Sequence, residues 1–166
     1  MNNVIKDVGY RTNGELYIGV VGSVRSGKSM FIRKFIQTKI LPFVEDEEIK
    51  NKILDELPQS AEGRTIMTVE PKFVPSTPVQ ITVDDDLKLN IRMVDCVGYI
   101  IESAKGYVNE DGSPRLVKTP WFNENIAFEE AATIGTQKVI TNHSHIGILM
   151  TSDGSFGEFQ RFEYEK

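Results

Sequence analysis

The most informative part of this sequence is Gly22-Ser23-Val24-Arg25-Ser26-Gly27-Lys28-Ser29, which reads GSVRSGKS and matches the pattern G-x-x-x-x-G-K-[ST] at every fixed position. Loops of this pattern bind phosphate groups, because their backbone N–H groups and the N-terminus of the following helix point at the anion. We therefore predict that all eight residues hold a nucleotide's phosphates, with Lys28 reaching the β- and γ-phosphates and the Ser29 hydroxyl binding Mg²⁺. The alternative is an ordinary glycine turn that leads into a helix.

The residues on either side of this loop support phosphate binding. Residues 15–21 form a short apolar run suited to a strand buried on both faces, and the run ends at Gly22. From Lys28 to Pro42 the apolar residues recur at helical spacing, as Phe31, Ile32, Phe35, Ile36 and Ile40. Strand, glycine-rich loop and helix follow one another in the order that phosphate binding requires.

The rest of the chain predicts a single α/β domain over residues 1–166. The expected elements are a polar lead-in at 1–14, a charged helix at 45–57, a β-hairpin of 79–83 and 89–93, a long functional loop at 99–125, a helix at 127–142 and a buried strand at 146–150. The chain ends soon after that last strand, where such a sheet usually gains two more strands. We therefore expect a C-terminally truncated domain whose last strand has an unpaired edge.

Asp95 ends an apolar strand in the pattern apolar-apolar-Asp-x-x-Gly. A carboxylate there would hold Mg²⁺ through water, while the Gly98 amide meets the γ-phosphate. A turn aspartate is the alternative for Asp95 alone. The hairpin upstream indicates a P-loop NTPase of the GTPase-like (TRAFAC) branch, in which one strand of a mostly parallel sheet is antiparallel, a feature that RecA-like ATPases and nucleotide kinases lack.

In this branch a loop threonine closes on Mg²⁺ and the γ-phosphate, and Thr65 and Thr68 are the candidates here. A surface-loop threonine is the alternative for either. Tyr99 stands where a glutamine commonly orients the attacking water, so we expect slow or differently organised hydrolysis. Arg25 either reaches a phosphate or points to solvent.

Composition limits the partners and the compartment. The chain has 19 basic and 24 acidic residues and a net charge of −5, so nucleic acid is not an expected partner. Its single cysteine, Cys96, cannot form an internal disulfide, and neither a signal peptide nor a membrane-spanning run is present, which predicts a cytoplasmic location. The guanine-reading motif Asn-Lys-x-Asp is missing, and the residues do not choose between adenine and guanine.

Several longer segments resemble the N-terminal nucleotide-binding domain of the stage IV sporulation protein A family, spore-coat scaffolds of endospore-forming bacteria. They are YIGVVGSVRSGKSMFIRKF (17–35), DELPQSAEGRTIMTVEPKFVP (55–75), IRMVDCVGY (91–99), AKGY (104–107), TPWF (119–122) and the region from EEAATIGTQKVI to TSDGSFG (129–157). Together these segments extend over nearly the whole chain.

The resemblance implies a domain that binds and hydrolyses ATP with Mg²⁺ and uses hydrolysis to drive self-assembly into a static polymer. It implies that Lys28 is the Walker A lysine, Asp95 the Walker B aspartate and Thr68 the first of two sensor threonines, the second being replaced by Val69. The implied location is the mother-cell cytoplasm at the forespore surface. The implied partners are other copies of the protein and, through regions outside this chain, stage V sporulation protein M and other spore-coat proteins, so that the membrane is reached only indirectly.

Two other functions are compatible with the residues. One is a structural scaffold in which bound nucleotide is a folding ligand that is not hydrolysed, and Tyr99 favours it. The other is a GTPase switch, which would need a guanine-reading motif outside this chain.

Overall fold

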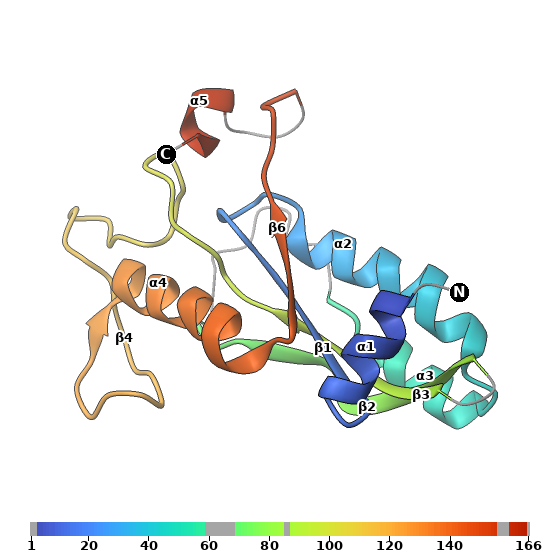
Figure 1. Ribbon diagram of the computed structural model, residues 1–166. Helices are drawn as coiled ribbons and strands as arrows, with labels where there is room; N and C mark the ends of the chain where they lie inside the picture. The colour runs from blue at the N-terminus through green and yellow to red at the C-terminus, as the bar shows by residue number, and fades with distance from the viewer. Residues whose placement is uncertain (1–2, 59–68, 85–86, 156–159, 166) are drawn as a thin grey trace.

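The computed structural model describes residues 3–58, 69–84, 87–155 and 160–165, and its centre is a four-stranded β-sheet (Figure 1). The strands lie in the order β2-β3-β1-β6, with bounds β1 (Glu15–Gly22), β2 (Lys72–Asp84), β3 (Leu87–Asp95) and β6 (Ile146–Met150). β1 is parallel to β3 and to β6, whereas β2 is antiparallel to β3. The predicted α/β fold, with a mostly parallel sheet and one antiparallel hairpin strand, is confirmed.

Helices cover both faces of this sheet, because its central strand β1 is apolar on both sides. One face carries α1 (Asn3–Arg11), α2 (Lys28–Phe35), α3 (Glu47–Glu56) and the short helical turns η1 (Ile36–Ile40) and η2 (Leu41–Phe43). The other face carries α4 (Phe128–Lys138), which continues into the turn η3 (Val139–His143). Figure 1 shows α2 and α4 on opposite sides of the strands.

The larger core lies on the α2 face. Its central members come from alternate positions of β1 and β3 and from one side of the helices: Leu16, Ile18, Val20, Ile32, Ile36, Ile40, Ile53, Leu89, Ile91 and Met93. Ile32 and Ile36 are fully buried, and burying each such side chain contributes about 1.5–3 kcal/mol. This packing holds the start of α2 firmly beside the end of β1.

On the other face, α4 packs closely against the segment that precedes β2. Phe128, Ala131 and Ala132 form a buried cluster with Val69, and a Cβ added at Gly135 would lie 2.6 Å from the Val69 carbonyl oxygen. The Trp121 ring lies against the same glycine, which makes it an anchor of the long loop.

A second local contact joins α3 to β2. Glu56, at the end of α3, accepts hydrogen bonds from the backbone N–H of Ser76 at 2.6 Å and from its hydroxyl at 2.8 Å. Burial by itself raises the pKa of Glu56, but the two Ser76 hydrogen bonds and the charge of Lys52 lower it below the ordinary value of 4.5.

The N-terminal lead-in is the first place where the structure differs from the prediction. Residues 3–11 form helix α1, and its Gly9 lies so close to β3 that a Cβ there would be 2.8 Å from a methyl group of Leu87 and 3.0 Å from one of Leu89. A nine-residue helix is marginal in water and is stabilised by its packing, which local sequence does not reveal.

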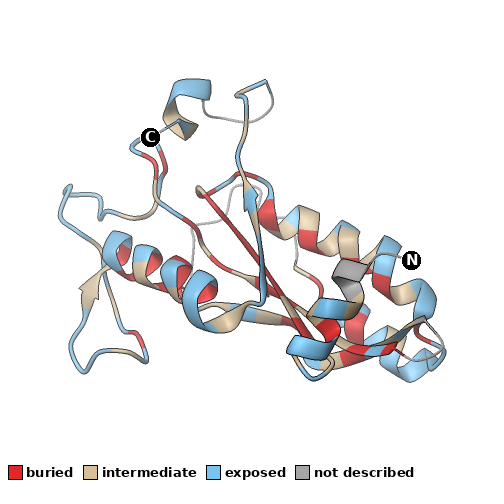
Figure 2. Ribbon diagram, viewed as in Figure 1, coloured by how far each residue is buried: buried red, intermediate tan, exposed pale blue. Residues whose placement is uncertain are grey.

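The last strand is the second difference. β6 is correctly placed, but it is not a buried strand, because Ile146 is 40% exposed and Leu149 is 75% exposed. Figure 2 shows β6 largely exposed beside the buried β1. Among the described strands β6 pairs only with β1, so one of its edges has no neighbour there, as predicted.

The long loop after β3 is mostly irregular, as predicted, but it contains the two-stranded hairpin β4 (Leu116–Val117) and β5 (Ile126–Ala127). A short helix, α5 (Arg161–Tyr164), lies near the chain's end. None of the described helices is long and apolar enough to cross a membrane.

Candidate nucleotide-binding site

The predicted phosphate loop lies where β1 ends and α2 begins, and its backbone conformation depends on glycine. Gly27 has a φ of 89° and immediately precedes the first turn of α2, and Arg25 has a φ of 60°. At Gly22 an added Cβ would overlap with the carbonyl group of Met150 on β6. The glycines therefore allow a left-handed turn and a close approach of backbones. The first turn of α2, which follows at once, has N–H groups without partners inside the helix.

Lys28 is buried inside this loop, with only 4% of the residue exposed. Its Nζ donates a 2.5 Å hydrogen bond to the Ser23 carbonyl oxygen. Burial lowers the pKa of Lys28 below its ordinary value, although the nearby Cys96 and Asp95 oppose this. The backbone of the loop thus holds the ammonium group of its own lysine.

Ser29 and Asp95 meet beside the lysine. The Ser29 hydroxyl donates a 2.7 Å hydrogen bond to Asp95 Oδ2, although the two residues lie 66 positions apart. Asp95 ends β3 and is in register with Val20, so the carboxyl ends of two parallel strands bring it to the loop. Burial raises the pKa of Asp95, against the lowering effects of Ser29 and Lys28.

These residues fit a magnesium ion. Asp95 Oδ1 is fully buried and accepts no hydrogen bond within the part of the chain that the structure describes. A buried carboxylate oxygen is costly without a partner, and a serine hydroxyl beside a carboxylate is the oxygen donor set that Mg²⁺ accepts together with water and phosphate oxygens.

Gly98 lies directly against the loop. Its φ is 95°, and an added Cβ would overlap with the Gly22 carbonyl oxygen and lie 2.6 Å from Lys28 Nζ. The next residue, Tyr99, donates its N–H to the Gly22 carbonyl at 3.1 Å and accepts from the Val24 N–H at 2.7 Å. The backbone after Asp95 is thus paired with the phosphate loop.

Most of the predicted site residues are therefore together: residues 22–29, Asp95 and Gly98. Arg25 is an exposed residue of the loop. Thr65 and Thr68 lie outside the described residues. The neighbouring Val69 is 3% exposed and packs against α4, so this residue, at the second sensor position, is part of the core.

Cys96 is buried beneath the site rather than exposed in it. It is 7% exposed, and its thiol donates to the Val20 carbonyl at 3.5 Å and accepts from the Thr136 hydroxyl at 3.7 Å. Burial raises the pKa of this thiol, which keeps it protonated and unreactive.

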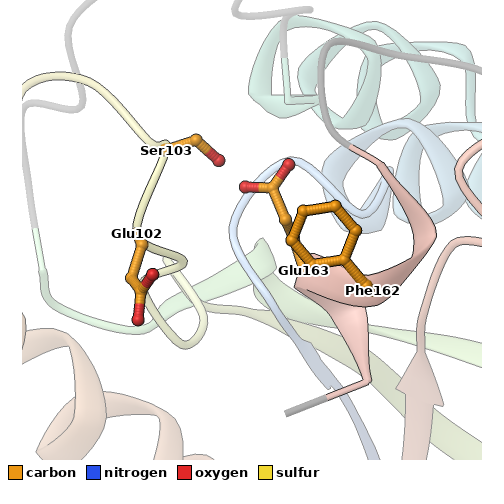
Figure 3. A pocket seen from close by; sticks show the side chains of 4 residues that line it. All are labelled: Glu102, Ser103, Phe162 and Glu163. Carbon is orange, nitrogen blue, oxygen red and sulfur yellow. The ribbon is translucent and has the colours of Figure 1, made fainter.

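A separate hollow lies between the loop after Gly98 and α5. Glu102, Ser103, Phe162 and Glu163 line it, and Figure 3 shows Ser103 and Glu163 facing each other across it. Its two carboxylates repel anions, so this hollow does not suit phosphate.

Comparison with known proteins gives the family. The family model described as "Stage IV sporulation protein A, ATPase domain" matches residues 1–166. The chain belongs to the stage IV sporulation protein A family. It is 55% identical over 162 residues to the protein of that name from Bacillus anthracis, 52% identical over 162 residues to that of Bacillus subtilis (strain 168), and 53% identical over 163 residues to that of Clostridioides difficile (strain 630).

These matches cover 98% of the chain but 33% of each relative, so the chain spans about a third of the length of the curated relatives it matches. No solved structure shows a significant match to the chain. The family match agrees with the sequence resemblance and supports a sporulation ATPase.

Two features of the site were not predicted from sequence. One is the backbone pairing of Tyr99 with the loop, and the other is a buried cluster of Val24 with Ile101 and Ala104. The sequence feature that could have predicted the cluster is Val24 itself. Phosphate loops usually have small residues at this position, and a bulky apolar side chain there is expected to pack against other apolar side chains.

Proposed function

We propose that this domain binds ATP with Mg²⁺ and hydrolyses it, and that hydrolysis drives self-assembly of the whole protein on the forespore surface in the mother cell. The observation that carries the enzymatic part is the meeting of Lys28, Ser29 and Asp95 at one partly buried place at the end of β1. Membership of a family described by an ATPase domain supports adenine as the base.

We assign the domain to the GTPase-like (TRAFAC) branch of P-loop proteins. The support is the sheet order β2-β3-β1-β6 with β2 antiparallel to β3, since this strand pair separates that branch from RecA-like ATPases and nucleotide kinases.

Each residue has a distinct role in this proposal. Lys28 places a positive charge at the β- and γ-phosphates, and the amides of Arg25, residues 27–29 and Gly98 donate to phosphate oxygens. Ser29 and Asp95 would hold Mg²⁺. When bound, Mg²⁺ neutralises charge on the β- and γ-oxygens. Thr68 closes on the metal and the γ-phosphate, as the family resemblance implies.

A second function is favoured by Tyr99. Its side chain is 39% exposed and has no amide to orient a water molecule, and its backbone holds it against the loop. Such an arrangement suits a scaffold in which bound nucleotide stabilises the fold and is not cleaved.

Single-turnover cleavage of ATP and of GTP with Mg²⁺ tests the proposal, with the protein at its natural length. Lys28→Ala should abolish cleavage, and Thr68→Ala should abolish cleavage while it keeps nucleotide binding. Lys34→Ala is the matched control, because Lys34 is an exposed lysine on the same helix and should have no effect.

Preferential cleavage of ATP that is lost in Lys28→Ala and Thr68→Ala and kept in Lys34→Ala supports the ATPase. Binding of nucleotide without cleavage above the Lys28→Ala background refutes the ATPase and leaves the scaffold. Assembly is then tested by sedimentation of wild type and Lys28→Ala with ATP. A polymer that forms equally in both would separate assembly from hydrolysis.

The partners outside this chain are part of the same proposal. Attachment to stage V sporulation protein M and to other spore-coat proteins is assigned to regions that the chain does not contain, and contact with the membrane is indirect. Binding of nucleic acid is not proposed, because the chain has a net charge of −5.

A further inference from the structure

Val24 has a position that its place in the phosphate loop does not explain. Its side chain is 4% exposed and lies in a buried cluster with Ile101 and Ala104, against which Ile100, Tyr107 and Tyr164 also pack. The backbone of Val24 belongs to the loop, whereas its side chain belongs to a cluster built by the segment after Gly98. One residue therefore joins two parts of the site that lie more than 70 positions apart in the sequence.

The backbone makes a second connection at the same place. Tyr99 bonds to Gly22 and to Val24, on either side of an isolated parallel bridge between Ser23 and Tyr99. Two hydrogen bonds alone leave this short pairing weak, since a net hydrogen bond contributes about 0.5–1.5 kcal/mol. The Val24 side chain adds buried apolar contacts beside it, which stabilise the pairing without any polar group of their own.

The consequence reaches the reacting groups. Gly98 comes immediately before Tyr99 and lies against Lys28 Nζ, so the pairing at Tyr99 sets the distance between the Gly98 amide and the lysine. If the segment moved by one ångström, the Gly98 amide would no longer lie where the γ-phosphate meets Lys28, and displacements of this size can cost about 100-fold in rate.

We propose that Val24 is a positioning residue for ATP cleavage, whose side chain, through Ile101 and Ala104, holds Gly98 at a constant position beside Lys28. This inference rests on the ATPase proposed above. It assigns to the Val24 side chain a role in the chemical step and not in binding, because the phosphates contact the loop's backbone.

The position of α5 fits this role. Tyr164 of α5 packs on the cluster from outside, and α5 faces the loop at Glu102 and Ser103 across the hollow of Figure 3. The segment after β6 thus covers the cluster, and β6 itself contacts the loop, because its Met150 carbonyl lies against Gly22. Apolar contacts therefore hold one side of the loop, and a backbone contact holds the other.

The test uses Val24→Ala in the protein at its natural length, with Val79→Ala as the matched control. Val79 is 5% exposed and lies in β2 within the α2-face core, so the same two methyl groups are removed at a site without contact to the loop. Val24→Ile is the conservative variant. Each protein is measured for its unfolding midpoint, the dissociation constant of ATP and the single-turnover rate of cleavage.

We expect Val24→Ala and Val79→Ala to lower the unfolding midpoint to a similar degree. Only Val24→Ala should slow cleavage, by about tenfold or more, with the ATP dissociation constant changed by less than about threefold. Val24→Ile, which keeps a β-branched apolar side chain in the cluster, should cleave faster than Val24→Ala. A folded Val24→Ala protein with the wild-type rate, or an equal slowing in Val79→Ala, would overturn the proposal. If Val24→Ala does not fold, Val24→Thr replaces it in the comparison. Threonine keeps the shape of valine but places a hydroxyl group in the apolar cluster, so the same slowing of cleavage is expected.

Amide hydrogen exchange separates this proposal from the ATPase itself. If the wild-type protein cleaves no ATP, the proposed function fails. The rate of amide exchange of residues 99–104 then tests whether the Val24 side chain holds this segment in place. Faster exchange there in Val24→Ala than in Val79→Ala would show that the Val24 side chain holds the segment after Gly98 in place, and equal exchange would refute this.

Discussion

Gly98→Ala is the change that tests the geometry of the phosphate site most directly. Gly98 has a φ of 95°, and a Cβ at this position would overlap with the Gly22 carbonyl oxygen and lie 2.6 Å from Lys28 Nζ. The lysine end is flexible and can give way, but the carbonyl belongs to the backbone of the phosphate loop. The methyl group must therefore move either the loop or the segment that carries Gly98.

The cost has two parts. An alanine in a left-handed conformation costs about 1–2 kcal/mol, and forcing a methyl group into a filled space costs about 1–3 kcal/mol more. We therefore expect Gly98→Ala to destabilise the protein by about 2–5 kcal/mol. Because the displacement lies beside Lys28, we also expect cleavage of ATP to fall by about 100-fold or more.

Gly112→Ala is the control. Gly112 has a φ of 80°, and a Cβ there would have nothing within 4 Å. This variant therefore has the cost of an alanine in a left-handed conformation but no steric clash. Urea unfolding and single-turnover cleavage are measured for both variants and for wild type. We expect Gly112→Ala to lose about 1–2 kcal/mol of stability and to cleave at the wild-type rate.

Equal stability of Gly98→Ala and Gly112→Ala, with wild-type cleavage in both, would contradict this geometry. If Gly98→Ala is no less stable than Gly112→Ala and cleaves ATP at the wild-type rate, then Gly98 does not approach the loop as described. Its amide would then have no fixed place beside Lys28.

Three further changes test the packing away from the site. Glu56→Gln weakens two hydrogen bonds from Ser76 and should lower stability by about 1 kcal/mol at pH 7. Because the pKa of Glu56 is lowered on folding, this contribution is present above the ordinary value of 4.5 and is lost as the pH falls through the lower folded value. A loss that is the same at pH 3 and pH 7 in urea titrations would contradict it. Gly135→Ala should destabilise by about 1–3 kcal/mol despite alanine's better helix propensity, because the new Cβ would lie 2.6 Å from the Val69 carbonyl oxygen. A Cβ added at Gly147 on β6 would have nothing within 4 Å, so Gly147→Ala should change stability by less than about 1 kcal/mol. The unfolding midpoints of Gly135→Ala and Gly147→Ala are compared.

Much of the fold was predictable because its signals are local. An apolar run, a glycine-rich loop and helical spacing follow one another within residues 15–40, and the hairpin alternates with a period of two. The helix α1 and the exposure of β6 were not predicted, because both depend on which other surface is nearby. A strand's sequence shows that it is apolar, but only the sheet order shows that β6 has a single described neighbour.

Residues near one another in the chain indicate the groups of the candidate site: a phosphate loop with its lysine and serine, an aspartate at a strand end, and a family membership that local motifs already indicated. How these groups meet depends on the fold. The hydrogen bond from Ser29 to Asp95 and the pairing of Tyr99 with Gly22 and Val24 join residues 66 or more positions apart. Such contacts depend on the register of parallel strands and on side chains that fill the space between them, and neither is specified by residues near in sequence.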